Sequence, residues 1–196
     1  METLLSVCVG IGLSAACGFR VFLPLLVMSI ASLSGHMTLA HGFEWIGTYP
    51  AMLAFSVATV LEIAGYYIPW LDHLLDTIAT PSAIVAGTIV TASAVGDMSP
   101  FLKWCLAVIA GGGAAGLVQG ATVVTRGAST VATGGLTNPL VSTLELAGAA
   151  VMSVLAIVAP LLAVTLLAAV LIVFGRKLFK RYRSMSPSPT TQPGLL

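Results

Sequence analysis

The chain has 196 residues, of which 58% are hydrophobic and only 8% are charged, and its formal net charge is +1. Because soluble domains carry about a quarter charged residues, this composition excludes an ordinary soluble protein. Crossing a bilayer takes about 20 apolar residues, and five runs approach or exceed that length: residues 3–33, 50–70, 82–97, 101–125 and 139–175. The sequence therefore predicts an all-α bundle of transmembrane helices, with one membrane domain over residues 1–183.

The first run lacks the positive region of a cleavable signal, because Glu2 is its early charge, and we expect it to stay as a span. Arg20 lies inside it, with apolar or small residues on both sides. An ionised side chain at the bilayer centre costs about 2.5–3.5 kcal/mol, so Arg20 needs a partner, a cavity or an interface. Gly18 and Pro24 predict a break in the helix here, which would free backbone groups to bind an ion. The alternative is that Arg20 merely reaches an interface.

The second run contains Glu62, a carboxylate in the membrane interior, and is followed by an amphipathic segment at residues 69–78. The polar and apolar residues of this segment separate onto two helical faces, and Asp72 and Asp76 lie one turn apart on the polar face. We expect an interfacial helix at the inner membrane surface. Its two aspartates are either solvated or share a cation, with His73 as a weaker ligand.

The segment TRGASTVATGGLTNP, residues 125–139, is rich in hydroxyls and glycines and is expected to form an inner loop. Asn138 fits a cap for the helix that follows, whose free N–H groups could also hold an anion. Glu145 lies about one and a half turns into that helix. We expect Glu62 and Glu145 either to face a polar interior with a functional role or to pair structurally with Arg20.

The last run would be about 55 Å long as one helix, nearly twice the hydrocarbon thickness. A reversal at Pro160 would make two short spans and six in total, whereas a single kinked helix would give five. Five basic residues follow this run, so the positive-inside rule places the C-terminus in the cytoplasm, and six spans place the N-terminus there too. The Ser/Pro/Thr-rich tail, residues 184–196, is expected to be disordered.

The two halves of the chain, residues 1–98 and 99–183, share a pattern. Small residues recur at four-residue steps in both halves: Gly10, Ser14 and Gly18 in the first, and Gly112, Gly116 and Gly120 in the second. Each series is followed by a loop ending in Pro and then by a span that contains a glutamate. Three spans per half would make the second half an inverted copy of the first, as in many transporters. The alternative is that these residues form ordinary packing faces, within the chain or between copies of it.

Five motifs stand out along the chain: Glu62, IP at 68–69, LDHLLD at 71–76, PSAIVAG at 81–87 and TNPLVSTLE at 137–145. Together they resemble a bacterial integral-membrane family catalogued as domain of unknown function 4126, over about residues 5–175. The resemblance marks as motif positions Glu62, Asp72, Asp76, Asn138, Pro139 and Glu145. The chain departs from the pattern at Tyr66 and Tyr67, where an Asp-Lys pair often stands, and at Leu146, where a second acidic residue often stands. The resemblance implies a bacterial inner-membrane protein and names no substrate.

The leading functional hypothesis is a small transporter or channel. Arg20, Glu62 and Glu145 would form its site for a small ion or solute, and Asp72, Asp76 and Asn138 are further candidates for binding. No cofactor is expected. The one basic cluster is short and juxtamembrane, so a nucleic-acid partner is not expected either, and membrane lipids are the expected surroundings.

Two other functions fit the same sequence. A membrane-embedded enzyme could act on a lipid with a metal held by Asp72, His73 and Asp76, although the chain has no H-E-x-x-H pattern. A non-catalytic scaffold or assembly factor could use its small-residue faces for contacts between copies and its basic tail for anionic lipid.

Overall fold

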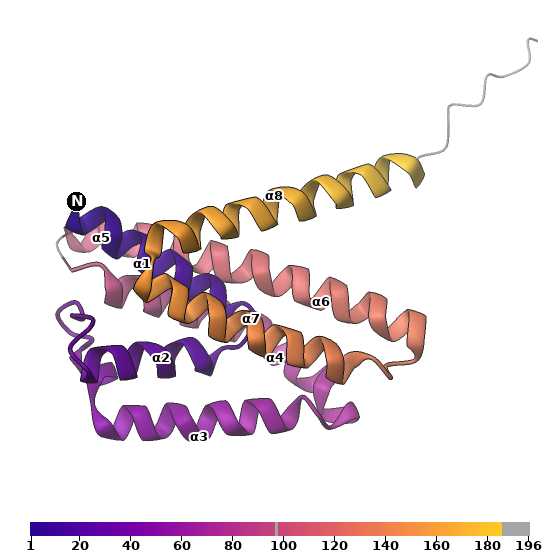
Figure 1. Cartoon of the computed structure of the whole chain (residues 1–196), viewed down its shortest axis with the longest axis horizontal. Coiled ribbons are helices and arrows are strands. Elements are labelled where there is room, and N and C mark those ends of the chain that lie inside the picture. Colours follow the sequence, from indigo (N-terminus) through magenta and orange to yellow (C-terminus); the bar gives the residue numbers. More distant parts are fainter. Residues whose placement is uncertain (97, 186–196) are drawn as a thin grey trace, which may run out of the picture.

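The computed structural model describes residues 1–96 and 98–185, and the regular structure within them is helical throughout. The elements are α1 (Glu2–Cys17), α2 (Phe22–Leu33), the 3₁₀ turn η1 (Glu44–Gly47), α3 (Tyr49–Gly65), α4 (Pro69–Ala94), α5 (Pro100–Leu106), the π-helical η2 (Ala107–Gly112), α6 (Gly113–Thr133), α7 (Asn138–Val158) and α8 (Pro160–Met185). They pack as one bundle around α1 (Figure 1). The expected all-α bundle is confirmed. Of the predicted tail, residues 186–196 lie outside the described residues.

Within residues 1–96 and 98–185, four stretches are long and apolar enough to cross a membrane: Leu74–Ala94, Pro100–Thr133, Asn138–Val158 and Pro160–Lys177. The last two confirm that the final apolar run is split at Pro160. The residue before it, Ala159, leaves helical geometry with φ −141° and ψ 71°, and Pro160 begins α8. A proline at the first helical position loses no hydrogen bond, so the reversal needs no polar loop.

The first apolar run is broken, as Gly18 and Pro24 predict, but it does not cross the bundle. α1 ends at Cys17, and α2 begins at Phe22 and returns toward the end where α1 started (Figure 1). With 16 and 12 residues, these helices are about 24 and 18 Å long, shorter than a hydrocarbon layer of about 30 Å. Pro24 lies in the first turn of α2, where a missing N–H costs little. Residues 18–21 form what we call the hairpin tip.

This hairpin places the N-terminus differently from the prediction. α1 runs antiparallel to α4, because Gly10 lies beside Ala94 whereas Ser14 Oγ donates to Gly87 O at 2.6 Å. The loop after α2 packs on the same end of α4, where Ala40 N donates to the penultimate carbonyl of the helix at 2.8 Å. The N-terminus therefore lies with residues 34–48, and α8 ends at the opposite end of the bundle (Figure 1). The prediction that both termini share a side is wrong, because the first run turns back.

The amphipathic segment 69–78 is part of α4 and does not form a separate interfacial helix. α4 runs unbroken from Pro69 to Ala94 with Pro81 inside it. In the turn before Pro81, Thr80 Oγ1 donates to Asp76 O at 3.3 Å. Pro81 removes the helical hydrogen bond to the carbonyl four residues earlier, at Thr77, and membrane helices tolerate such a proline where neighbouring groups contact the freed carbonyl. Asp76, on the polar face of this segment, consequently lies within the bundle, where its side chain is 19% exposed.

Small residues allow α1, α4 and α6 to approach closely. A Cβ built on Gly87 would lie 2.6 Å from Ala115 Cβ, and one built on Gly18 would lie 2.5 Å from Ala115 O. α1 and α6 both run antiparallel to α4, so they run parallel to each other, whereas an inverted repeat would make these two glycine-stepped helices antiparallel (Figure 1). Packing therefore accounts for Gly10, Gly18, Gly112 and Gly116, whereas a Cβ built on Gly120 would meet no atom within 4 Å. The helices that carry Glu62 and Glu145, α3 and α7, do run in opposite directions.

Candidate functional site

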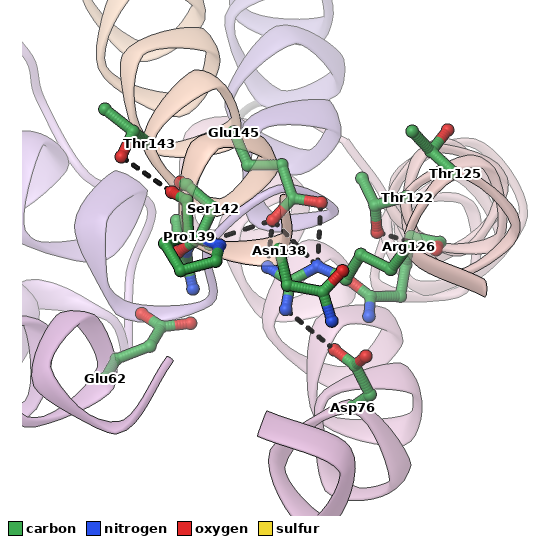
Figure 2. Close-up of polar contacts among 12 residues, drawn as sticks. Glu62, Asp76, Thr122, Thr125, Arg126, Asn138, Pro139, Ser142, Thr143 and Glu145 are labelled. Atoms are coloured by element: carbon green, nitrogen blue, oxygen red, sulfur yellow. Dashed lines mark hydrogen bonds and ion pairs between the residues drawn. The ribbon is translucent and has the colours of Figure 1, made fainter. Parts of the chain in front are cut away.

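A buried cluster of charged side chains lies where α4, α6 and α7 meet, beside the hairpin tip. Arg126 of α6 is 4% exposed, and its Nε donates to both oxygens of the Glu145 carboxylate on α7, at 3.0 and 3.1 Å. Its Nη2 also contacts Glu145 Oε2, and its Nη1 lies 3.3 Å from Asp76 Oδ1 on α4. Figure 2 shows Arg126 between these two carboxylates. One guanidinium thus joins three helices through charge-assisted hydrogen bonds, which are stronger than neutral ones.

Arg20 joins this cluster from the hairpin tip. It is 1% exposed, its Nη2 donates to the carbonyl and hydroxyl oxygens of Ser142 at 3.0 and 2.5 Å, and the same nitrogen lies 3.8 Å from Glu145 Oε2. Its Nε and Nη1 have no hydrogen-bond partner among the described residues. Both guanidinium groups pack on the Tyr66 ring, with Arg20 Cζ 3.9 Å and Arg126 Cζ 4.1 Å from its centroid. Such cation–π contacts stabilise desolvated guanidinium groups.

Glu62 of α3 binds backbone groups of the hairpin tip. Its Oε1 accepts from Val21 N at 2.8 Å and its Oε2 accepts from Phe22 N at 3.1 Å, so the carboxylate caps the start of α2. The first N–H groups of a helix have no partner within it, and the helix dipole favours negative charge there. Glu62 makes no ion pair within the described residues, and it is only partly buried. The break thus frees backbone groups, as Gly18 and Pro24 predict, and a carboxylate of the chain binds them.

Carboxylates outnumber guanidinium groups in this cluster. Arg20 and Arg126 stand against Glu62, Asp76 and Glu145, which gives a formal charge of −1 when all five are ionised. Asp76 and Glu145 are paired with Arg126, whereas Glu62 is held by backbone dipoles. Among these five residues, Glu62 is therefore the carboxylate that can give up its contacts without breaking an ion pair.

Asn138 begins α7, but its side chain bonds to the preceding helix. Its Nδ2 donates to Thr130 Oγ1 at 3.1 Å, and its Oδ1 accepts from Ser129 Oγ at 3.0 Å. α6 extends to Thr133 and ends at Gly134, whose φ is 64°, so much of the predicted inner loop is helical. Asn138 thus fastens the turn between α6 and α7.

The predicted aspartate pair of α4 is described only in part. The Asp76 side chain is 19% exposed and pairs with Arg126, so the prediction of a solvated Asp76 is wrong, because α4 continues into the bundle. The side chains of Asp72 and His73 lie outside the described part of the molecule. Among the side chains that are described, no three His, Cys, Asp or Glu residues gather as metal ligands would.

A groove of about 430 Å³ opens between α6, α7 and α8, beside the cluster. Apart from Thr122, Thr125 and Glu145, its lining is apolar, and Phe19 of the hairpin tip forms part of its wall. Glu145 therefore borders both the groove and the buried cluster.

Three members of the cluster are missing from the sequence-based site: Arg126, Tyr66 and Ser142. The sequence analysis assigns Arg126 to an inner loop. The pair Gly134 and Gly135, both with positive φ, was the available signal, because a helix commonly ends at such a glycine and would then include Arg126. Tyr66 and Ser142 carry no comparable signal, since their roles depend on how distant helices pack.

A family model described as "Domain of unknown function (DUF4126)" matches residues 7–180, a region that contains the whole cluster. Comparison with curated proteins gave no match, and comparison with solved structures gave none. Since the matching description names no activity, the geometry of the cluster is the basis for inferring one.

Proposed function

We propose, from the geometry of the cluster, that this chain, which belongs to the DUF4126 family, is a transporter or channel for a small ion or solute. The family match confirms the resemblance seen in its motifs. One observation carries the proposal: a broken helix inside an apolar bundle, with the Glu62 carboxylate bound to the freed N–H groups of Val21 and Phe22. α1 and α2 form a hairpin, and the start of α2 inside the bundle presents free N–H groups like those that bind substrates in the discontinuous helices of transporters. In the proposal, Glu62 takes up the coupling proton or cation.

The difference between Glu62 and its neighbours supports this assignment. Ionisable residues inside a membrane are costly, and they commonly mark ion pathways. Asp76 and Glu145 would each break an ion pair with Arg126 if they moved or took up a proton. Glu62 has no such partner among the described residues and is partly exposed, so its charge can change while the ion pairs stay formed.

Orientation in a bacterial inner membrane is part of the same proposal. The last turns of α8 lie at one end of the bundle and contain five basic residues: Arg176, Lys177, Lys180, Arg181 and Arg183. Lys103 is the basic residue near the opposite end. By the positive-inside rule the C-terminus is then cytoplasmic, next to anionic lipid, and the N-terminus faces outside.

Proton flux into liposomes that contain the purified protein is expected to depend on Glu62. Glu62→Gln keeps the shape of the side chain but cannot take up and release a proton, so the flux should fall by about tenfold or more, which corresponds to at least ~1.4 kcal/mol in the barrier. A pH-sensitive dye trapped in the liposomes measures this flux under an imposed membrane potential in sodium chloride.

The matched control is Glu44→Gln, which removes a carboxylate from the exposed loop before α3. Glu44 bonds there to His41 and to Gly42 N, far in sequence from the cluster. This variant should keep the wild-type flux. The proposal fails if wild-type liposomes acidify no faster than protein-free liposomes, or if Glu62→Gln is as active as the wild type.

A further inference from the structure

We infer that the start of α2 and the Arg20 guanidinium form a binding site for a small monovalent anion, and that the Glu62 carboxylate occupies this site as a tethered competitor. The inference rests on the proposed function, because it assigns a class of substrate, small monovalent anions, to the proposed transporter.

The backbone half of the site is already seen binding an anionic group. Val21 N and Phe22 N donate to separate oxygens of the Glu62 carboxylate, at 2.8 and 3.1 Å. These N–H groups begin a helix of 12 residues, so the helix dipole adds to their attraction for an anion. The carboxylate comes from α3 and reaches the tip as a side chain, so a free anion of the same shape can replace it without rearranging the backbone.

The Arg20 guanidinium has hydrogen-bond donors that the described residues do not use. Arg20 directly precedes Val21, is 1% exposed, and directs its Nη2 to Ser142, a neutral residue. Glu145 lies closer to Arg126 than to Arg20, and Arg20 Nε and Nη1 have no hydrogen-bond partner among the described residues. A buried charged donor without a partner is costly, so these two nitrogens favour an anion at the tip.

The charge of the cluster selects a single negative charge. When Glu62 is protonated or moves away, Arg20 and Arg126 are balanced by Asp76 and Glu145, and the start of α2 is left without its anion. A monovalent anion then restores the original charge, whereas a divalent one exceeds it. Uptake of a proton by Glu62 and entry of an anion are therefore coupled.

Chemical rescue tests this site without any measurement of flux. Glu62→Ala removes Cγ and the carboxylate group, and these two carbons with their oxygens have the structure of acetate. Acetate should therefore raise the Tm of Glu62→Ala in detergent by about 2–4 °C, in a saturable way. Acetamide, which has the same shape without the charge, should have little effect. Wild-type protein should respond less than Glu62→Ala, because its own carboxylate already binds Val21 N and Phe22 N. Glu44→Ala serves as the control for general salt effects.

Each outcome bears on the inference. Equal responses to acetate and acetamide, or an acetate response no larger than that of Glu44→Ala, would overturn it. If Glu62→Ala does not fold alone, the yield of monodisperse protein purified in acetate is compared with that in acetamide: a higher yield in acetate supports the site, and equal or no yield overturns it. Acetate rescue without Glu62-dependent proton flux would leave the site and remove transport, whereas flux without rescue would leave transport and remove the anion site.

Discussion

Replacing Arg126 by methionine is expected to lower the free energy of unfolding by about 3–5 kcal/mol. The change removes the group that pairs with both Glu145 and Asp76, at a position that is 4% exposed. The loss is large because two carboxylates in the bundle lose their contacts with Arg126, and within the described part of the chain Glu145 keeps only the 3.8 Å contact with Arg20, whereas methionine restores only the apolar volume. Denaturant titration of the detergent-purified protein, followed by circular dichroism, measures the change.

Two further variants make this expectation specific to the ion pair. Arg176→Met removes an exposed arginine from α8 and should change stability by less than about 0.5 kcal/mol. In the double variant Arg126→Met with Glu145→Met, one of the two carboxylates that lose contact with Arg126 is also gone, so the two losses should fall short of additivity by about 0.5–3 kcal/mol. Strict additivity, or equal losses for Arg126→Met and Arg176→Met, would show that the pair does not hold the helices together.

Gly111→Ala is expected to destabilise the protein by about 1–3 kcal/mol through overpacking. Gly111 lies in η2 against α4, and a Cβ built on it would meet Thr91 Oγ1 and lie 2.7 Å from Gly87 O. A backbone carbonyl cannot rotate away as a side chain can, so α4 and η2 would have to separate. Thermal unfolding in detergent, compared with wild type, measures the effect.

Gly113→Ala is the matched control, because it adds the same methyl group two residues later. A Cβ built on Gly113 meets no atom within 4 Å. Alanine restricts the unfolded chain more than glycine does, so this variant should gain about 0.5–1 kcal/mol. A loss in both variants would mean that the close approach of α4 to η2 is not the cause.

The charged residues of the site could be predicted where they interrupt apolar sequence. Arg20, Glu62 and Glu145 lie inside long apolar runs, so their cost in a membrane identifies them. The break near Arg20 could be predicted for a similar reason, because glycine and proline are local signals. Arg126 lies just past the end of the run 101–125, where a charge costs little, and it was assigned to a loop.

The contacts that complete the site depend on packing between distant segments. The reversal at the hairpin tip needs Glu62 from α3 to bind Val21 and Phe22, which no local pattern contains. The sequence of its own segment predicts that Asp76 is solvated. The continuation of α4 beside α6 is what brings Asp76 to Arg126. Periodicity identifies the faces of a helix but not the partner that each face meets.

The hairpin also sets an order for assembly of the bundle. Arg20 and Ser142 are 122 positions apart, so the ribosome completes α1 and α2 long before α7 exists. Until then, neither helix is long enough to span the bilayer, and the Arg20 guanidinium has none of its final acceptors on α7. The contacts between the hairpin and α7 can therefore form only after most of the later helices have been made. α1 and α2 precede α7 in synthesis but depend on it to complete their packing.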